Sequence, residues 1–237
     1  MKNFTSNISN CSLLETNRDS KLVVYGTDLY LIGESEQNYS FVKISESSKS
    51  FKVLPSISDK RSGFCVCSFM QKIIVIGGNI NEETINSCFA YDTKTNKLTY
   101  IASMNESRKD TSCTIFQGKS VVTGGLKVKT CLHSGNKIPC LLKSVEAYCF
   151  YENKWTKLSD MLQGKSGHRT VIVGNKIVVI ARYFINGCEV YDSVTSKFTS
   201  IKTILCLKTL TVIRQKGSTV RLKLSVRLLL VIKYIFL

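Results

Sequence analysis

One short pattern recurs along the chain and constrains its fold more than any other feature. A run of apolar, β-branched residues ends at Gly77-Gly78, and a second run ends at Gly124-Gly125. Gly33 follows a similar run earlier, and Ala181 stands at the corresponding place later, so the four points are 44, 47 and 57 residues apart. Repeats of this length predict a solenoid or a propeller, in which one supersecondary unit is copied along the chain.

Other landmarks keep a constant distance from these points. A basic residue lies sixteen positions before each of the last three points, namely Arg61, Arg108 and Lys165. Farther along each copy, a first apolar or aromatic residue is followed seven positions later by a bulky one, in the pairs Ile44–Phe51, Tyr91–Leu98, Tyr148–Trp155 and Tyr191–Phe198. Agreement at several landmarks indicates a true structural repeat.

Within each copy the local signals are those of strands. Short β-branched runs alternate with turn sequences such as Asp92–Asn96, and no long amphipathic helix is evident between Val23 and Ser200. Each copy therefore predicts four short antiparallel strands, of which the second ends at the glycines. The glycines are expected where the backbone needs a positive φ or a close approach. Large aromatic side chains would fill the space between neighbouring twisted sheets.

At these residues the chain resembles the kelch repeat family, over about residues 21 to 208. The resemblance implies an all-β fold, a kelch-type β-propeller with about four blades of four antiparallel strands. Leu98 replaces the tryptophan usual in the family. Gly33 stands alone in the first copy and Ala181-Arg182 replaces the glycine pair in the fourth, so the first and fourth copies are divergent. The structural positions of the repeat are Gly33, Gly77, Gly78, Gly124, Gly125, Tyr91, Tyr148, Trp155, Tyr191 and Phe198.

The repeat divides the chain into a leader, four blades and a tail. The expected ranges are 1–20, 21–60, 61–107, 108–164, 165–207 and 208–237. Kelch-like proteins carry BTB and BACK domains before a propeller that commonly has six blades, and residues 1–20 cannot hold those domains. We therefore expect an incomplete propeller from a longer or shortened gene product, with a small closed ring as the alternative.

The net charge of +16 is unevenly distributed. No acidic residue follows Asp192, and half of the net charge lies in the last 39 residues, which predicts either a non-homologous end or an amphipathic strand over Arg221–Leu228. The preceding body has no basic stripe interleaved with aromatics, so we expect no nucleic-acid partner. The chain has no signal peptide and no apolar run long enough for a membrane span, which favours a cytoplasmic protein with ten largely buried thiols.

No catalytic constellation is evident, so we expect neither an enzyme nor a cofactor. The chain has two histidines, and Gly164-Lys165-Ser166 lacks the first glycine of a phosphate-binding loop. Cys131, His133 and Cys140 lie near one another in a loop, but zinc requires a fourth ligand, so exposed loop residues are the favoured interpretation and no metal is expected. Cys65 and Cys67 are interpreted as buried packing on one face of a strand.

The loops remain as candidates for binding. The third copy exceeds the repeat length by about ten residues, and the excess lies in a loop over Leu126–Leu142. The candidate partner-binding residues form a basic rim that would recognise an acidic or phosphorylated peptide, and they are Arg61, Arg108, Lys127, Lys129, His133, Lys165, His168 and Arg169. Since Arg61, Arg108 and Lys165 recur with the repeat, a structural role is an equally strong interpretation.

The resemblance suggests a protein-binding scaffold. By the same resemblance it would recognise a protein substrate for a cullin-RING ubiquitin ligase, with the cullin bound through a separate BTB protein. Actin binding is the alternative within the family, and a truncated product without function is a further one. A propeller enzyme would need clustered acids, histidines or metal ligands along the central channel, which the sequence does not offer.

Overall fold

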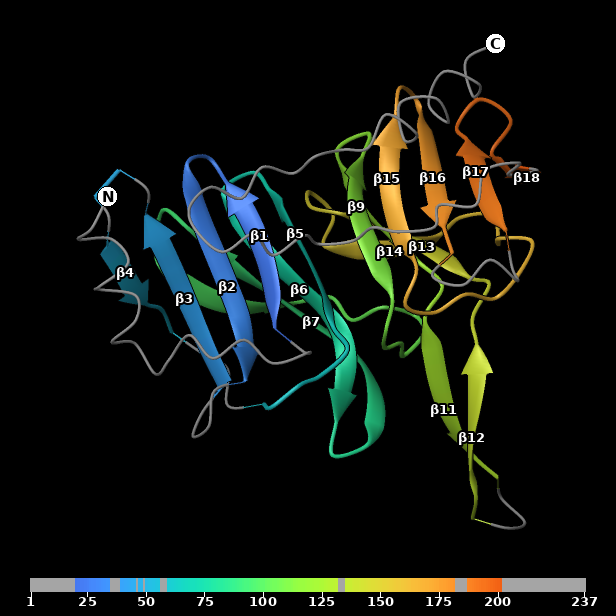
Figure 1. Cartoon of the computed structure of the whole chain (residues 1–237), viewed down its shortest axis with the longest axis horizontal. Helices are drawn as coiled ribbons and strands as arrows, with labels where there is room; N and C mark the ends of the chain where they lie inside the picture. Colours follow the sequence, from blue (N-terminus) through green and yellow to red (C-terminus); the bar gives the residue numbers. More distant parts are fainter. Residues whose placement is uncertain are drawn as a thin grey trace, which may run out of the picture.

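The computed structural model describes residues 20–34, 39–45, 47–48, 50–55, 59–131, 135–181 and 187–201. Every regular element in this part of the chain is a β-strand. The strands form four antiparallel sheets of four strands and one two-stranded hairpin (Figure 1). We refer to the four-stranded sheets as blades 1 to 4 in chain order.

In blades 1, 2 and 4 each strand pairs with the next strand in sequence, and in blade 3 the hairpin β11–β12 is inserted between the second and third strands. Blade 1 contains β1 (Lys21–Tyr25), β2 (Asp28–Glu34), β3 (Tyr39–Ser45) and β4 (Ser50–Val53), and blade 2 contains β5 (Cys65–Phe69), β6 (Lys72–Ile80), β7 (Glu83–Asp92) and β8 (Lys97–Ile101). Blade 3 contains β9 (Ser112–Phe116), β10 (Lys119–Thr123), β13 (Val145–Cys149) and β14 (Lys154–Lys157). Blade 4 contains β15 (Arg169–Val173), β16 (Lys176–Ile180), β17 (Cys188–Asp192) and β18 (Lys197–Ile201). Between β10 and β13 the chain forms the hairpin of β11 (Leu126–Thr130) and β12 (Lys137–Leu141).

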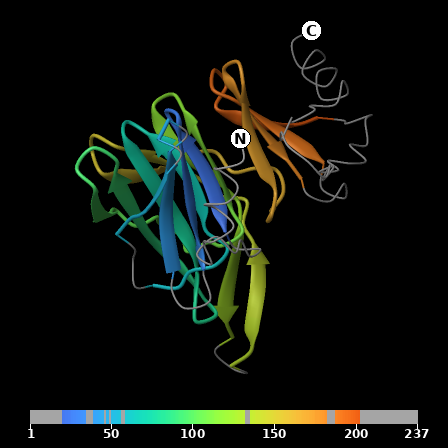
Figure 2. The ribbon, with the colours of Figure 1, turned by 60° about the vertical axis from the view of Figure 1, so that its left-hand side comes forward.

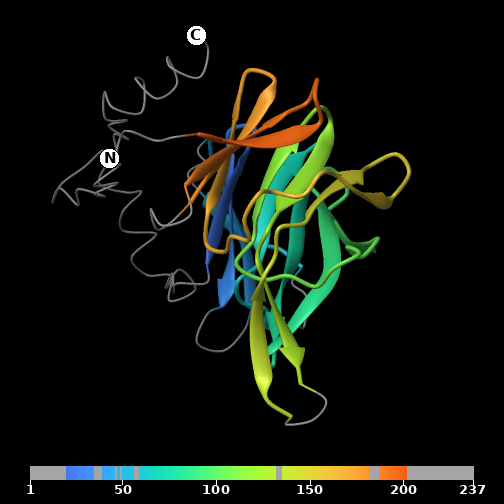
Figure 3. The same cartoon turned by 90° about the vertical axis from the view of Figure 1, so that its right-hand side faces the viewer.

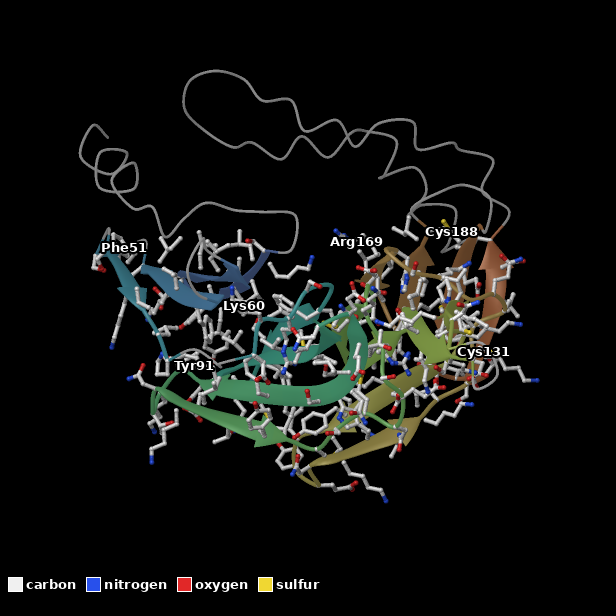
Figure 4. All side chains as sticks on the ribbon, turned by 90° about the horizontal axis from the view of Figure 1, so that it is seen from below. Phe51, Lys60, Tyr91, Cys131, Arg169 and Cys188 are labelled. Atoms are coloured by element: carbon white, nitrogen blue, oxygen red, sulfur yellow. The ribbon has the colours of Figure 1, made fainter. Side chains whose placement is uncertain are left out.

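The blades are arranged radially. Their first strands, β1, β5, β9 and β15, contact one another in chain order. Seen from below, the four sheets follow one another along an arc (Figure 4). The predicted β-propeller architecture is thus confirmed, and within the described residues the arc does not close into a ring.

Hydrophobic cores fill the spaces between successive blades. Tyr91 lies between blades 1 and 2, where its ring packs at 4.9 Å from that of Phe41. Tyr148 and Trp155 lie between blades 2 and 3, and Tyr191 and Phe198 between blades 3 and 4. Each repeat tyrosine also stands directly opposite the bulky residue seven positions later on the adjacent strand. The seven-residue spacing is therefore the register of the hairpin that joins the third and fourth strands.

The glycine pairs adopt the backbone that the sequence predicts. Gly77 and Gly124 have φ values of 60° and 54°, and a Cβ at either would lie 2.5 or 2.6 Å from a backbone carbonyl of the next inter-blade segment. One expectation was wrong, because β6 does not end at its glycines. It continues to Ile80 through a register shift between Ile76 and Gly78, so the strand bulges there instead of terminating.

Candidate partner-binding surface

The recurring basic residues are buried inside their blades. Arg108 Nη1 donates to the carbonyl oxygen of Gly124 at 2.7 Å and to that of Ser144 at 3.1 Å. Its Nη2 lies 2.6 Å from Glu146 Oε1. In blade 4, Lys165 Nζ lies 2.9 Å from Glu189 Oε1, and both of these side chains are buried as well. The two ion pairs are therefore equivalent parts of successive repeats.

In blade 2 the corresponding base, Arg61, keeps the same backbone contacts but has a different side chain beside it. Arg61 donates to the carbonyl oxygens of Gly77 at 3.2 Å and Ser87 at 3.1 Å, as Arg108 does to Gly124 and Ser144. Phe89, however, stands two residues before the repeat tyrosine, where blades 3 and 4 have glutamate. The ring of Phe89 lies 5.0 Å from Arg61 Cζ, so a cation–π contact stands in place of the buried glutamate, while Arg61 Nη2 also lies 3.7 Å from Asp59 Oδ2.

The buried glutamates also hold the segments between blades. Glu146 accepts hydrogen bonds from the backbone N–H groups of Asn105 and Glu106, which precede blade 3. Glu189 does the same for Leu162 and Gln163, which precede blade 4. Each carboxylate thus satisfies a buried base and two backbone donors at once, so its role is to fix one blade to the segment that enters it.

His168 is buried in the same layer. Its Nε2 lies 2.7 Å from Thr123 Oγ1, and its side chain is fully enclosed. Burial, and then the positive charge of Lys165, lower the pKa of His168 to about 4, so the imidazole is neutral at physiological pH. Arg61, Arg108, Lys165 and His168 therefore belong to the interior, and the structural interpretation of the three bases is the one that their contacts favour.

Two of the remaining candidates lie on a projecting hairpin. The long loop expected in the third copy is instead the hairpin β11–β12, which extends away from the blades (Figures 1 and 3). Lys127 and Lys129 alternate along β11, half-buried and exposed respectively. His133 lies outside the described residues. Arg169 is exposed at the start of β15, apart from this hairpin (Figure 4).

A second hairpin accompanies the first. The extended ends of β6 and β7 project on the same side as β11–β12 (Figures 1 and 2). Val128 N–H donates to Thr84 Oγ1 at 3.1 Å, and Lys137 Nζ lies 2.8 Å from Glu82 Oε2. We call residues 79–84, 126–130 and 137–141 together the twin-hairpin surface. It joins two adjacent blades and is the most prominent projection of the described structure.

Lys127 and Lys129 were expected in a loop. Ile138, which is 49% exposed beside them, was not among the predicted binding residues. The sequence did indicate a strand here, because apolar or small residues alternate with basic ones from Leu126 to Thr130. Cys65 and Cys67 are buried between blades 2 and 3, as expected. Within the described ranges, no group of three or more potential metal ligands is present and no helix is long and apolar enough to cross a membrane.

Comparison with known proteins agrees with this architecture. Residues 60–105, which contain blade 2, match the Kelch motif. The chain is 32% identical to Kelch-like protein 41a of Danio rerio over 140 residues, which cover 59% of this chain and 22% of the relative. It is 29% identical to Kelch-like protein 26 of Danio rerio over 62% of this chain and 23% of that relative. A third relative, Kelch repeat-containing protein kel-10 of Caenorhabditis elegans, is 28% identical over 52% of this chain and 21% of its own length.

The matched region thus spans less than a quarter of each of these relatives. The motif match, these relatives and the radial four-stranded sheets agree with one another. This chain therefore contains a Kelch motif and is similar to kelch repeat proteins in sequence and in architecture.

Proposed function

We propose that the chain is a protein-binding module that presents its partner surface on the twin-hairpin surface. The observation that carries this proposal is the joint projection of two hairpins from adjacent blades, linked by the Val128–Thr84 and Lys137–Glu82 contacts. Rigid sheets that hold variable connections on one side are a common design for binding sites. Arg108, Lys165 and their glutamate partners would support this function, because they hold blades 3 and 4 against the segments that precede them.

More specifically, the module would recognise a protein substrate for a cullin-RING ubiquitin ligase. This finer role is supported by the likeness to two Kelch-like proteins. The cullin would be bound by a separate BTB-containing protein. Co-precipitation of a cullin with this chain is therefore expected only when such a BTB protein is co-expressed.

A two-part experiment tests this role. Purified chain is first mixed with purified cullin, and no complex is expected. Tagged chain is then cross-linked in cells, and cross-links to substrate are expected at lysines of the twin-hairpin surface. Direct binding of the purified cullin, or cross-links confined to the outer strands β4, β8, β14 and β18, would contradict the proposal. Co-sedimentation with actin filaments would instead support the alternative within the family.

A further inference from the structure

One face of the β11–β12 hairpin combines positive charge with exposed apolar surface. Lys127 and Lys129 point to the same side of β11, because alternate residues of a strand share a face. Their partners in the register of β12 are Cys140 and Ile138. Among the described residues, neither lysine forms an ion pair with an acidic side chain, and Ile138 is 49% exposed. We call these four residues the Lys–Ile face.

We propose that the Lys–Ile face binds an extended acidic segment of a protein partner, with acidic residues at alternate positions and an apolar side chain against Ile138. This inference rests on the proposed protein-binding function and specifies the chemistry of the partner. Side chains two residues apart in a strand are separated by about 7 Å. An extended peptide repeats its side chains at the same interval, so two of its carboxylates can meet Lys127 and Lys129 together.

The other face of this hairpin already has an acidic contact. Glu82, on the tip between β6 and β7, places its carboxylate 2.8 Å from Lys137 Nζ on the β11–β12 hairpin. Lys137, with a smaller contribution from Lys109, lowers the pKa of Glu82. Because the pair is exposed, it stabilises the fold little. Because Lys137 is paired with Thr130 in the register, it lies on the face of the hairpin away from Lys127 and Lys129, so Glu82 leaves the Lys–Ile face open to an acidic partner.

The backbone edges of the hairpin disfavour binding by strand addition. The bonds from Cys131 N–H to the Asn136 carbonyl and from Leu142 N–H to the Gly125 carbonyl fix which residues of β12 face outward. Pro139 occupies one of the outward positions, so this edge lacks a donor in its middle. On the other edge, Val128 N–H is already bonded to Thr84. The partner is therefore expected to bind through side chains on the face of the hairpin.

The composition of the hairpin favours protein over nucleic acid. Single-stranded nucleic acid is bound by bases stacked on aromatic side chains, in addition to phosphate contacts. No Phe, Tyr or Trp occurs among the described residues of 126–142. Ile138 and Cys140 offer an apolar strip for a side chain such as leucine, but they do not offer a stacking platform.

A fluorescein-labelled peptide tests the inference with the full chain. The probe alternates glutamate with threonine and has one central leucine, and a second probe carries phosphoserine in place of glutamate to separate phosphate from carboxylate recognition. Fluorescence anisotropy is expected to show salt-sensitive binding. The double variant Lys127→Glu and Lys129→Glu should weaken binding by about tenfold or more. Ile138→Ser should weaken it without changing the salt dependence.

The matched control is Lys94→Glu with Lys97→Glu, which makes the same change in charge at an exposed turn of blade 2. The inference is overturned if this control loses as much affinity, if the probes fail to bind, or if an oligothymidylate binds more tightly than the peptides. Those results leave the proposed function standing when cellular cross-links still map to the twin-hairpin surface. Loss of the cross-links themselves overturns both proposals.

Discussion

Arg108 Nη2 lies 2.6 Å from Glu146 Oε1, with both side chains almost completely removed from solvent. The Lys165–Glu189 pair repeats this relationship one blade later. Glu146 and Glu189 each also accept backbone hydrogen bonds from the segment that precedes their blade. Buried ion pairs therefore lie where blades 3 and 4 each contact the segment that precedes them.

Removal of one member of this pair should destabilise the chain strongly. Glu146→Leu leaves Arg108 without its buried carboxylate and frees two backbone donors, so a loss of about 3–5 kcal/mol is expected. Urea unfolding followed by fluorescence measures it. Glu82→Gln, which breaks the exposed pair with Lys137, is the control and should change the free energy of unfolding by less than about 1 kcal/mol. Similar losses in the two variants would contradict a structural role for the buried pair.

His168 predicts a specific dependence of stability on pH. Its pKa in the folded chain is about 4, below the ordinary value of 6.5, because the imidazole is buried near Lys165. Between these values the unfolded state binds more protons, so stability should fall as the pH drops from 6.5 toward 4, by about 1.4 kcal/mol per pH unit from this group. His168→Gln should be less stable at pH 8 and should show a flatter decline. An unchanged slope would exclude His168 as its source.

Substitution of Gly124 tests whether the chain requires glycine directly after the end of β10. Gly124→Ala would force alanine into a positive φ and would place its Cβ 2.6 Å from the Lys165 carbonyl oxygen. Gly118→Ala is the control, because its φ of 73° is also positive but nothing lies within 4 Å of a Cβ there. The control should lose about 1–2 kcal/mol for the backbone conformation alone. Gly124→Ala should lose clearly more, as measured by thermal unfolding, and equal losses would show that the close approach is unimportant.

Trp155 connects two blades and provides an optical probe. Its Nε1 donates to the Ala102 carbonyl oxygen at 2.7 Å, and its ring lies in the core between blades 2 and 3. Since it is the single tryptophan of the chain, its emission should shift to longer wavelength when these blades separate. Trp155→Phe should cost about 1–2 kcal/mol by loss of the hydrogen bond and of packing volume. Emission typical of exposed tryptophan in the native chain would contradict this placement.

The repeat made much of the fold predictable. The sequence predicted four strands in each copy and a positive φ at the glycine pairs, because these features are set by local strand pairing and backbone geometry. The constant interval from Tyr148 to Trp155 was recognised in the sequence, and the structure shows that it is the register of one hairpin. The hairpin at 126–141 was missed because its length was interpreted as irregular, although its alternating residues indicated strands. Half of the candidate binding residues, including Arg61 and His168, proved to be interior, because a basic residue in a loop gives no sign of the carbonyls and carboxylates that enclose it.

The sequence by itself determined the kind of unit and its recurrence, since strand period, turn residues and glycine positions are encoded within about fifty neighbouring residues. Only the tertiary structure decided which charges are buried and which are offered to a partner. That distinction depends on contacts between segments far apart in the chain, such as Arg108 with Glu146 and Glu82 with Lys137. Burial changes the energetic role of an ion pair, because a charge removed from water must be compensated by its neighbours, whereas an exposed one remains solvated and exchangeable.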